Sequence, residues 1–472
     1  MNERALQRGL EFLDSWLPFR ERNTDVCGFK VAIHHRDDIV FTRSYGQANL
    51  QHRVPMGRDH VMGVGSQSKM LASTVLCQMV QRGSVRFDDR VCSYLPWLAQ
   101  HADGRVRNTT VRQLLNHSSG MSRNGADADC WNFAKPFPDE DAVRDLVLHT
   151  DVVVEPNTRL KYSNVGFAVL GALIEAVAGQ PYVDVVTANV IARIGMPDTA
   201  ADYGPVAARR LAAGYTPRIE GTRWVLPNPE TTGALAVATG VCSTPEDMCR
   251  FAAAHYAGCD VLLNETLRRE AHRGHCVVTL GQDVGMEMGL GFHAHIVDDR
   301  RYVGHSGSVG GFKSETLFDP DARLAVSIMA NCADAPSVEM VRGILQVLHY
   351  FEEHGAEPAP PDRDHFNARL RNARATVEIV ATRDSVVAVD PDGWEPFTLI
   401  EQLSVVDAET RRVRTAGSVF NEGESFRYVF DGPRLRSVTY AGFTMLPERS
   451  YVRLVESTGR AATGSLPVRV PA

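Results

Sequence analysis

A serine and a lysine three residues apart are the first residues whose types and spacing could do covalent chemistry. The segment Ser66-Gln67-Ser68-Lys69 stands where a loop enters an apolar helix expected from Ser66 to Arg82. Residues at i and i+3 share one helix face, so the Ser66 hydroxyl and the Lys69 amine can meet. Free N–H groups and the dipole at a helix amino terminus favour negative charge on the hydroxyl oxygen. The pattern predicts a nucleophile and its base, although a capping serine beside a solvated lysine has the same spacing.

The scarcity of lysine relative to arginine is a second reason to consider Lys69 as a base. Only five of the 50 basic residues are lysines: Lys30, Lys69, Lys135, Lys161 and Lys313. Arginine keeps its proton in proteins, whereas a desolvated lysine can lose it. The few lysines are therefore candidates for deprotonation chemistry, and Lys69 has apolar neighbours in sequence that predict its burial.

A tyrosine and an asparagine form the second candidate motif, Tyr162-Ser163-Asn164, just before a helix expected from Val165 to Ala178. A phenol beside a lysine can relay a proton, and a carboxamide can hold a substrate amide. Alternatively, Asn164 only caps the helix.

The third motif is the run His305-Ser306-Gly307-Ser308, which continues as Val309-Gly310-Gly311-Phe312-Lys313. Glycines allow a ligand to approach the backbone closely, and an exposed N–H can complete an oxyanion hole. His305, Gly307 and Ser308 are therefore candidate substrate-binding residues. The run is not a phosphate loop, because it has no Gly-Lys-Ser/Thr ending before a helix. A glycine-rich hairpin turn is the alternative interpretation.

In order and approximate spacing, the three motifs resemble those of the penicillin-recognising serine enzymes: Ser-x-x-Lys, Tyr-x-Asn, and Lys/His-x-Gly on the last core strand. Two further landmarks are similar to those of the class C β-lactamase-like branch, namely residues 114–121 (Leu-Leu-Asn-His-Ser-Ser-Gly-Met) and 240–244 (Gly-Val-Cys-Ser-Thr). The resemblance covers roughly residues 5 to 350.

This resemblance assigns a role to each motif residue. It implies that Ser66 is the acylated nucleophile, that Lys69 is its activating base, and that Tyr162 relays the proton to the leaving group. Asn164 would position the substrate. The backbone N–H groups of Ser66 and Ser308 would form the oxyanion hole.

His305 departs from the lysine found at this point in many β-lactamases. The departure favours the esterase, D-aminopeptidase and peptide-cyclising branches over β-lactam resistance. The expected function is a serine hydrolase that cleaves amide or ester bonds in small peptides with a D-configured residue at the acyl side. The alternatives are a penicillin-binding-protein-type thioesterase that cyclises a nonribosomal peptide delivered as a thioester on a carrier protein, a carboxylesterase, and a non-catalytic binding module.

The elements that must position these motifs predict an α+β fold. Apolar spacing predicts a first helix over Arg4–Leu17 and strands over Gly28–His34 and Ile39–Tyr45. Helical patterns dominate the middle of the chain, and strands return before a long helix expected over Ala335–Glu352. Strands at both ends and helices between them predict an antiparallel sheet flanked by helices, with a helical subdomain.

The residue pattern of the chain changes after residue 352. Residues 353–364 contain three prolines among acidic residues and predict a linker between a catalytic domain (1–352) and a small antiparallel β-barrel (365–472). By resemblance the barrel is lipocalin-like. The predicted β runs are Thr376–Val380, Val386–Val389, Phe397–Val406, Val413–Ala416, Ser425–Phe430, Ser437–Tyr440 and Tyr451–Leu454.

Composition limits the classes of partner and the cell compartment that we expect for this protein. The 472 residues carry a net charge of −7, which argues against a nucleic-acid partner. No apolar run predicts a secretory signal or a membrane span, and nine scattered cysteines without a C-x-x-C pair predict reduced thiols in a cytoplasmic protein. No cofactor is expected. His272, His275 and Cys276 come nearest to metal-ligand spacing but lack a fourth partner, so no metal site is expected.

Overall fold

The computed structural model describes residues 1–204, 210–280, 283–355, 357–407, 409–415 and 421–459, which divide into two compact units. One unit is Asp25–Val341, and the other combines Met1–Thr24 with the chain from Arg342 onward. This division differs from the expected boundary after residue 352. The first helix and most of the last helix of the expected catalytic domain group with the barrel instead.

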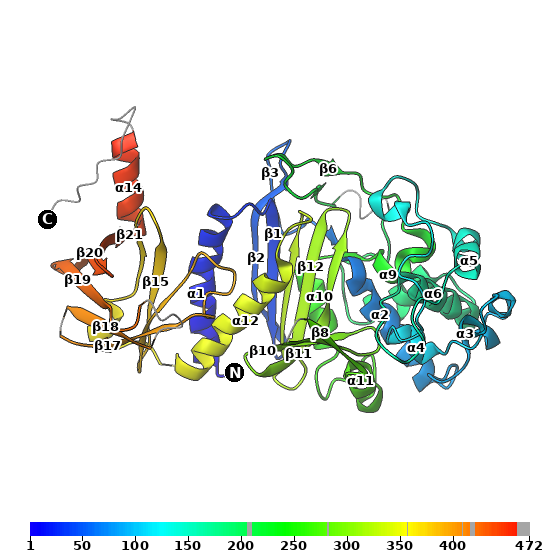
Figure 1. Ribbon diagram of the computed structural model, residues 1–472. Helices are drawn as coiled ribbons and strands as arrows, with labels where there is room; N and C mark the ends of the chain where they lie inside the picture. The colour runs from blue at the N-terminus through cyan, green and yellow to red at the C-terminus, as the bar shows by residue number, and fades with distance from the viewer. Residues whose placement is uncertain (205–209, 281–282, 356, 408, 416–420, 460–472) are drawn as a thin grey trace. The chain divides into compact units, whose positions relative to one another are not determined.

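A large antiparallel sheet forms the framework of the Asp25–Val341 unit (Figure 1). Its strand order is β3-β2-β1-β13-β12-β11-β10-β9-β8. The strands are β1 (Gly28–His35), β2 (Asp38–Asn49), β3 (Val54–Pro55), β8 (Cys276–Leu280), β9 (Asp283–Met288), β10 (His293–Val297), β11 (Arg300–Val309), β12 (Phe312–Asp319) and β13 (Leu324–Ala330). Strands from both ends of this unit therefore meet in one sheet, as the sequence predicts.

The centre of this sheet is buried on both faces. Every residue of β1 and of β13 is buried, and the two strands pair with Phe29 opposite Ala330. Their near-continuous apolar runs are typical of strands covered on both sides. Helix α10 (Pro245–Ala253) packs against β1, β12 and β13, with Thr244 as its N-cap.

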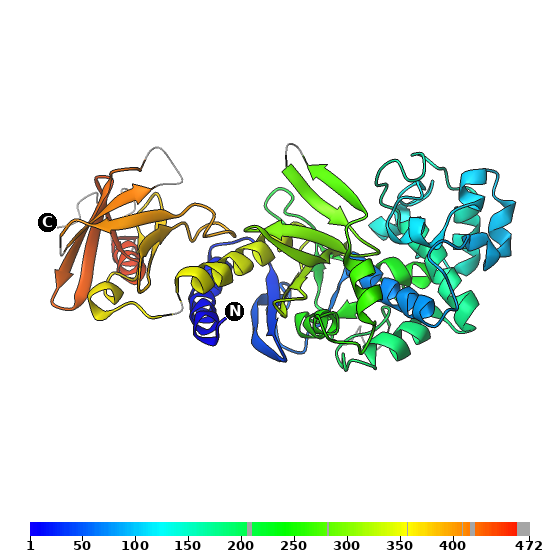
Figure 2. The same cartoon turned by 90° about the horizontal axis from the view of Figure 1, so that it is seen from below.

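The helices between β2 and β8 build the helical part of the unit (Figure 2). They include α2 (Ser68–Gln81), α3 (Gly104–Arg107), α4 (Val111–Leu115), α5 (Glu140–Leu148), α6 (Asn164–Ala178), α7 (Tyr182–Val186), α9 (Ala236–Thr239) and α11 (Glu265–His272). Twelve of the 14 residues of α2 are buried, which fits its broad apolar face. Short elements complete this part: the 3₁₀ turn η1 (Gly65–Gln67) and the strand pairs β4 (Met62–Gly63) with β7 (Cys242–Ser243) and β5 (Gly214–Tyr215) with β6 (Val225–Leu226).

The second unit contains a closed antiparallel barrel of eight strands, which confirms the predicted barrel. Its strands are β14 (Ala368–Arg371), β15 (Thr376–Ala381), β16 (Val386–Val389), β17 (Glu401–Val405), β18 (Thr410–Thr415), β19 (Ser425–Asp431), β20 (Arg434–Tyr440) and β21 (Phe443–Pro447). Inward side chains such as Leu370, Ile379, Phe426 and Tyr428 fill the interior.

The longer helices described in the barrel unit are α1 (Glu3–Arg22), α12 (Ser337–His354), which begins in the other unit, and α14 (Glu448–Gly459). The strand expected over Tyr451–Leu454 is wrong, because these residues lie within α14. Their alternating pattern is too short to exclude a helix. A short helix, α13 (Pro361–Asp364), also occupies the end of the expected linker.

Helix α1 joins the barrel unit through aromatic contacts. The Trp16 Nε1–H donates to the Pro391 carbonyl at 3.1 Å, and the Phe12 ring lies 5.4 Å from that of Phe397. These partners are almost four hundred residues away in the chain, so the helical spacing within residues 4–17 could not identify them.

Among the described residues, no single helix is both long enough and apolar enough to cross a membrane. One bent pair of helices in the same part of the chain, Asn164–Ala178 with Tyr182–Ile191, reaches that length and composition when the two are taken together.

Candidate active site

Ser66 and Lys69 meet at the start of α2. Ser66 lies in the turn η1 immediately before the helix, and the Lys69 Nζ is 3.1 Å from the Ser66 Oγ. Nζ also donates to the Ala238 carbonyl at 2.8 Å. Because Lys69 is fully buried, desolvation lowers its pKa well below the ordinary value, and the nearby Arg123 guanidinium lowers it further. A neutral amine in this position can accept the Ser66 proton.

Two glycines press the turn that carries Ser66 onto the open edge of β11. Gly65 has a φ of +56°, and a Cβ built there would lie 2.6 Å from the Ser308 nitrogen. A Cβ on Gly307 would lie 1.8 Å from the Val64 carbonyl oxygen. Only glycine permits both approaches. They bring the Ser66 segment directly beside the Ser308 N–H, which the sequence assigned to an oxyanion hole.

The strand order leaves room for a substrate at this point. Strand β10 pairs with Arg300–Gly304 of β11, and its described ladder goes no further. The third motif, His305–Ser308, occupies the next part of β11 and pairs with β12 on its other side. The backbone edge that faces Ser66 therefore carries no neighbouring strand in the described part of the sheet.

Tyr162 completes a compact group with the nucleophile and the lysine. Its hydroxyl is close enough to Ser66 for the Ser66 hydroxyl to lower its pKa, and the Lys69 Nζ lies 5.0 Å from the centre of its ring. Burial raises the pKa of Tyr162 strongly, and the Ser66 hydroxyl only partly offsets that effect. The group is therefore a neutral phenol at neutral pH, suited to donating a proton rather than to abstracting the first one.

Asn164 is not part of this cavity. Its Nδ2 donates to the Asn124 Oδ1 at 2.7 Å, its Oδ1 is buried without a hydrogen-bond partner, and it lines a separate cavity of about 350 Å³. Helix capping does not explain Asn164 either, since Ser163 is the N-cap and its Oγ accepts from the Gly166 N–H at 2.9 Å. The substrate-positioning role of Asn164 remains a prediction.

His305 is held in one tautomer. Its Nδ1 lies 2.6 Å from the Ser306 carbonyl oxygen, which can only accept, so Nδ1 carries the proton. Burial, with a smaller effect from Lys69, lowers the pKa of His305 well below the ordinary value. The imidazole is therefore neutral, and its buried Nε2 is an acceptor that has no hydrogen-bond partner among the described residues.

Two further histidines belong to this group although the motifs did not identify them. The His293 ring, on β10, lies 3.6 Å from the His305 ring, and both of its nitrogens are buried without a hydrogen-bond partner. The His117 ring lies 4.2 Å from the Tyr162 ring, and its Nδ1 accepts from the Ser163 N–H at 3.1 Å. His117 stood within the landmark 114–121, so the sequence offered a signal. His293 had none, because only the pairing of β10 with β11 brings it to the site.

A cavity of about 580 Å³ joins these groups. It is lined by Ser66, Tyr162, His305, Gly307 and Ser308 of the predicted site. Its remaining lining residues are Arg123, His293, Ser306, Lys313 and the segment 333–339, which precedes and begins α12. Lys69 does not line the cavity itself, but it contacts Ser66, which does. The cavity thus has a nucleophile, a buried base, a phenol and an open strand edge on one side.

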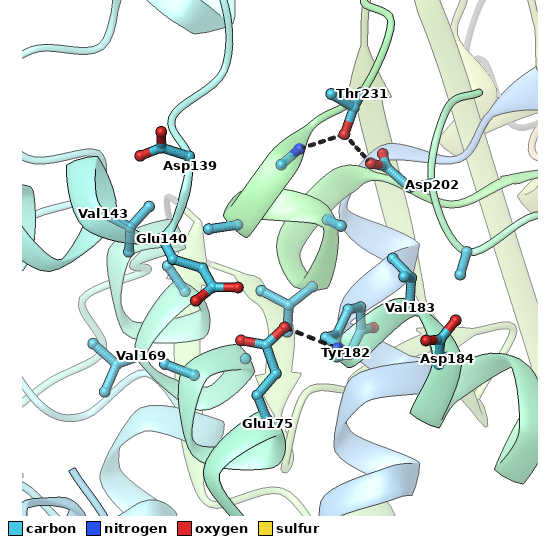
Figure 3. A pocket seen from close by; sticks show the side chains of 18 of the residues that line it. Asp139, Glu140, Val143, Val169, Glu175, Tyr182, Val183, Asp184, Asp202 and Thr231 are labelled. Carbon is cyan, nitrogen blue, oxygen red and sulfur yellow. Dashed lines mark hydrogen bonds between the residues drawn. The ribbon is translucent and has the colours of Figure 1, made fainter. Parts of the chain in front are cut away.

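A larger cavity of about 1170 Å³ lies elsewhere in the same unit (Figure 3). Residues of α5, α6, α7 and α9 line it, and carboxylates such as Glu140, Glu175 and Asp202 are prominent around it. None of the predicted site residues lines it. Its chemistry, carboxylates without a paired nucleophile and base, makes it a poor candidate for the reaction centre.

Within the described residues, no group of three or more His, Cys, Asp or Glu side chains is arranged to hold a metal ion. His272, from the weak metal-like spacing in the sequence, instead faces His255, with 3.2 Å between the His272 Nε2 and the His255 Nδ1.

Known proteins are similar to this chain over most of its length. Residues 17–349 match the family described as Beta-lactamase. Penicillin-binding protein 4* of Bacillus subtilis (strain 168) is 25% identical over 312 residues, which are 62% of this chain and 66% of that protein. The match thus spans slightly less than two thirds of the length of this relative.

Solved structures show the same fold over more of the chain. The octameric penicillin-binding protein homologue from Pyrococcus abyssi has a TM-score of 0.64 at 18% identity and covers 93% of this chain and 99% of that one. SurE with D-Leu has a TM-score of 0.57 at 19% identity and covers 94% and 100%. The D-amino acid amidase from Ochrobactrum anthropi SV3 has a TM-score of 0.59 at 22% identity and covers 73% and 98%.

Proposed function

The chain belongs to the beta-lactamase family, and from that premise we propose that it is a serine hydrolase that forms an acyl-enzyme on Ser66. Its proposed substrates are small peptides with an amide or ester bond and a D-configured residue on the acyl side. The observation that carries the proposal is the 3.1 Å contact between the Ser66 Oγ and a fully buried Lys69 Nζ.

Acylation follows from the positions of these groups. The Ser66 Oγ attacks the substrate carbonyl carbon while the neutral Lys69 amine takes its proton. The Ser66 and Ser308 N–H groups stabilise the oxyanion. The bond to the leaving amine or alcohol then breaks, and the Tyr162 phenol donates a proton to that leaving group. The Lys69 ammonium returns a proton to Tyr162, so both residues regain their starting states.

Deacylation uses the same groups in reverse order. A water molecule attacks the ester carbonyl, and its proton passes to the basic group formed by Lys69 and Tyr162. The bond between the acyl carbon and the Ser66 Oγ breaks, Ser66 recovers its proton, and the acid is released. A substrate amine in place of water would instead give a transferred or cyclised peptide.

From the tautomer of His305 we also infer a preference for substrates that carry an uncharged group next to this residue. A neutral imidazole whose free Nε2 is an acceptor can receive an N–H from a peptide amide, whereas it offers no positive charge to a carboxylate. The proposed D-configuration is supported by two proteins of similar fold, a D-amino acid amidase and SurE, which was solved with D-Leu.

Two measurements test this function. A fluorophosphonate probe should label wild-type protein at Ser66 and leave Ser66→Ala unlabelled, with peptide mapping to locate the adduct. Matched D- and L-alanyl peptide amides and esters should then be compared by mass spectrometry of their products. Faster turnover of the D-series to free acid supports the proposal, transferred or cyclised products indicate an acyltransferase, and absence of labelling in folded protein refutes the acyl-enzyme.

A further inference from the structure

Two cysteines that are far apart in sequence lie opposite each other at one end of the central strands. The register of β1 and β13 places Phe29 opposite Ala330. Extended two residues beyond the end of this ladder, the register brings Cys27 opposite Cys332. Both thiols are buried and free, and each shifts the pKa of the other.

The backbone geometry at this position suits a covalent link. The Asn331 N–H donates to the Gly28 carbonyl at 3.1 Å, so the residues that adjoin the two cysteines are joined directly across the strands. Residues that face each other on adjacent antiparallel strands have Cα atoms about 4.5–5.5 Å apart and side chains on the same face. Disulfides span Cα separations of about 4.4–6.8 Å, so a bond requires little backbone movement.

A single arginine holds the chain on both sides of the thiols. Arg223 donates to the Asp25 carbonyl at 3.0 Å and to the Asp334 Oδ1 at 2.6 Å, and these residues each lie two positions from a cysteine. The Cys332 thiol lowers the pKa of Cys27, with a smaller effect from the Arg223 guanidinium, against the opposing effect of burial. Cys27 is therefore the thiol better placed to react as a thiolate.

We propose that Cys27 and Cys332 are a modification site at which a two-electron oxidant of the peroxide class forms a reversible disulfide. The Cys27 thiolate attacks one peroxide oxygen, the O–O bond breaks, and the sulfur becomes a sulfenic acid as hydroxide leaves and takes up a proton. The Cys332 sulfur then attacks that sulfur, and a water molecule leaves. In total, two thiols and one hydrogen peroxide give one disulfide and two waters.

The modification affects the candidate active site through chain continuity. Cys332 immediately precedes the segment 333–339, which lines the cavity that contains Ser66. A disulfide brings the two sulfurs to about 2.05 Å, closer than a thiol hydrogen bond, and so displaces the first residues of this wall. Oxidation therefore alters the fit of peptide substrates, while the contact between Ser66 and Lys69, on another segment, stays in place.

Peptide mapping tests the pair directly. Full-length protein is treated with increasing hydrogen peroxide, its free thiols are blocked with iodoacetamide, and it is then digested with trypsin without reduction. Each cysteine lies alone in its tryptic peptide, residues 23–30 for Cys27 and 324–342 for Cys332. We expect a cross-link between these two peptides that dithiothreitol reverses. Cys27→Ser and Cys332→Ser should abolish it, whereas Cys259→Ser, which removes a more exposed thiol, should retain it.

Turnover of a peptide ester provides the second readout. Oxidation should change kcat/KM several-fold in wild type, dithiothreitol should restore it, and Cys27→Ser should not respond. Absence of the cross-link in protein that circular dichroism shows to be folded would overturn the proposal. A complete cross-link with unchanged kcat/KM would overturn its effect on the cavity. The cross-link is measurable without any activity, so its outcome is independent of the proposed function.

Discussion

Lys69 is the residue on which the proposed chemistry depends most. It is fully buried, it contacts Ser66, and its lowered pKa leaves an amine that can take a proton. We expect Lys69→Arg to slow acylation by about 10³-fold or more, on the order of 4 kcal/mol of transition-state stabilisation, because a guanidinium does not accept the proton. Single-turnover labelling with an activated ester measures the rate.

The control for that change is Lys135→Arg. Lys135 lies at the surface and pairs with Asp127, outside the cavity that contains Ser66. This variant should acylate at the wild-type rate, and Ser66→Ala should lose acylation about as completely as Lys69→Arg, since the two residues act as a unit. A folded Lys69→Arg protein with near-normal turnover would contradict the role of Lys69 as base.

His305 offers a test of substrate charge. Its neutral imidazole, with Nε2 free to accept, predicts preference for a peptide amide over the matched peptide acid. His305→Lys should move the preference toward the acid, because a desolvated ammonium pairs with a carboxylate. The ratio of kcat/KM for amide and acid measures this. His149→Lys, at the exposed end of α5, controls for net charge and should leave the ratio unchanged. Equal ratios in wild type and His305→Lys would assign specificity to other residues.

At the scale of elements, strand β12 contains a buried acid that should make stability depend on pH. Glu315 is fully buried, neither oxygen has a hydrogen-bond partner, and burial, with a smaller effect from Glu339, raises its pKa to about 8. In the unfolded chain the ordinary value is about 4.5. The folded state therefore holds this proton more tightly, so the contribution to stability is complete below pH 4.5 and is lost as the pH rises toward 8.

Glu315→Gln should remove that dependence. At pH 4.5 the two proteins should unfold at similar urea concentrations, because both side chains are neutral. At pH 8 the variant should be more stable by up to about 5 kcal/mol, because each tenfold difference in proton affinity between the folded and unfolded states corresponds to about 1.4 kcal/mol. Glu230→Gln, at an exposed position, should behave as wild type at both pH values. If the difference in stability between Glu315→Gln and wild type is the same at pH 4.5 and at pH 8, Glu315 ionises normally.

The sequence predicted the elements whose signals are local. The apolar face of α2, the start of the long helix α12 to within two residues, and the three motifs all depend on neighbours within a turn or a strand. The features that the sequence could not specify depend on contacts between segments that are distant in the chain. His293 reaches His305 only because β10 pairs with β11, and Asn164 points to Asn124 because of the entry to α6, which the Tyr-x-Asn spacing does not specify.

At the scale of the whole molecule, the first helix decides how the chain can be divided. The Asp25–Val341 unit contains the whole nine-stranded sheet and every residue that lines the candidate active-site cavity. We expect the fragment 25–341 to be soluble and to be acylated by a small activated ester. Gel filtration and ester labelling measure the two properties.

Truncation after Pro361 should give the opposite result. It keeps α1 but removes the partners of Trp16 and Phe12, Pro391 and Phe397. Each exposed aromatic side chain forfeits roughly 1.5–3 kcal/mol of burial, so this protein should aggregate or unfold at lower temperature than the fragment 25–341. Equal solubility of the two would show that α1 does not need the barrel.

The grouping of α1 with the barrel also has a consequence for biosynthesis. The ribosome makes this helix more than three hundred residues before the chain reaches Arg342 and the barrel. At about 5–20 residues per second, the interval is on the order of tens of seconds. Throughout that time Leu13, Trp16 and the other apolar residues of α1 have left the exit tunnel without their final partners. A chaperone that binds short apolar helices has its main opportunity on this chain during that interval.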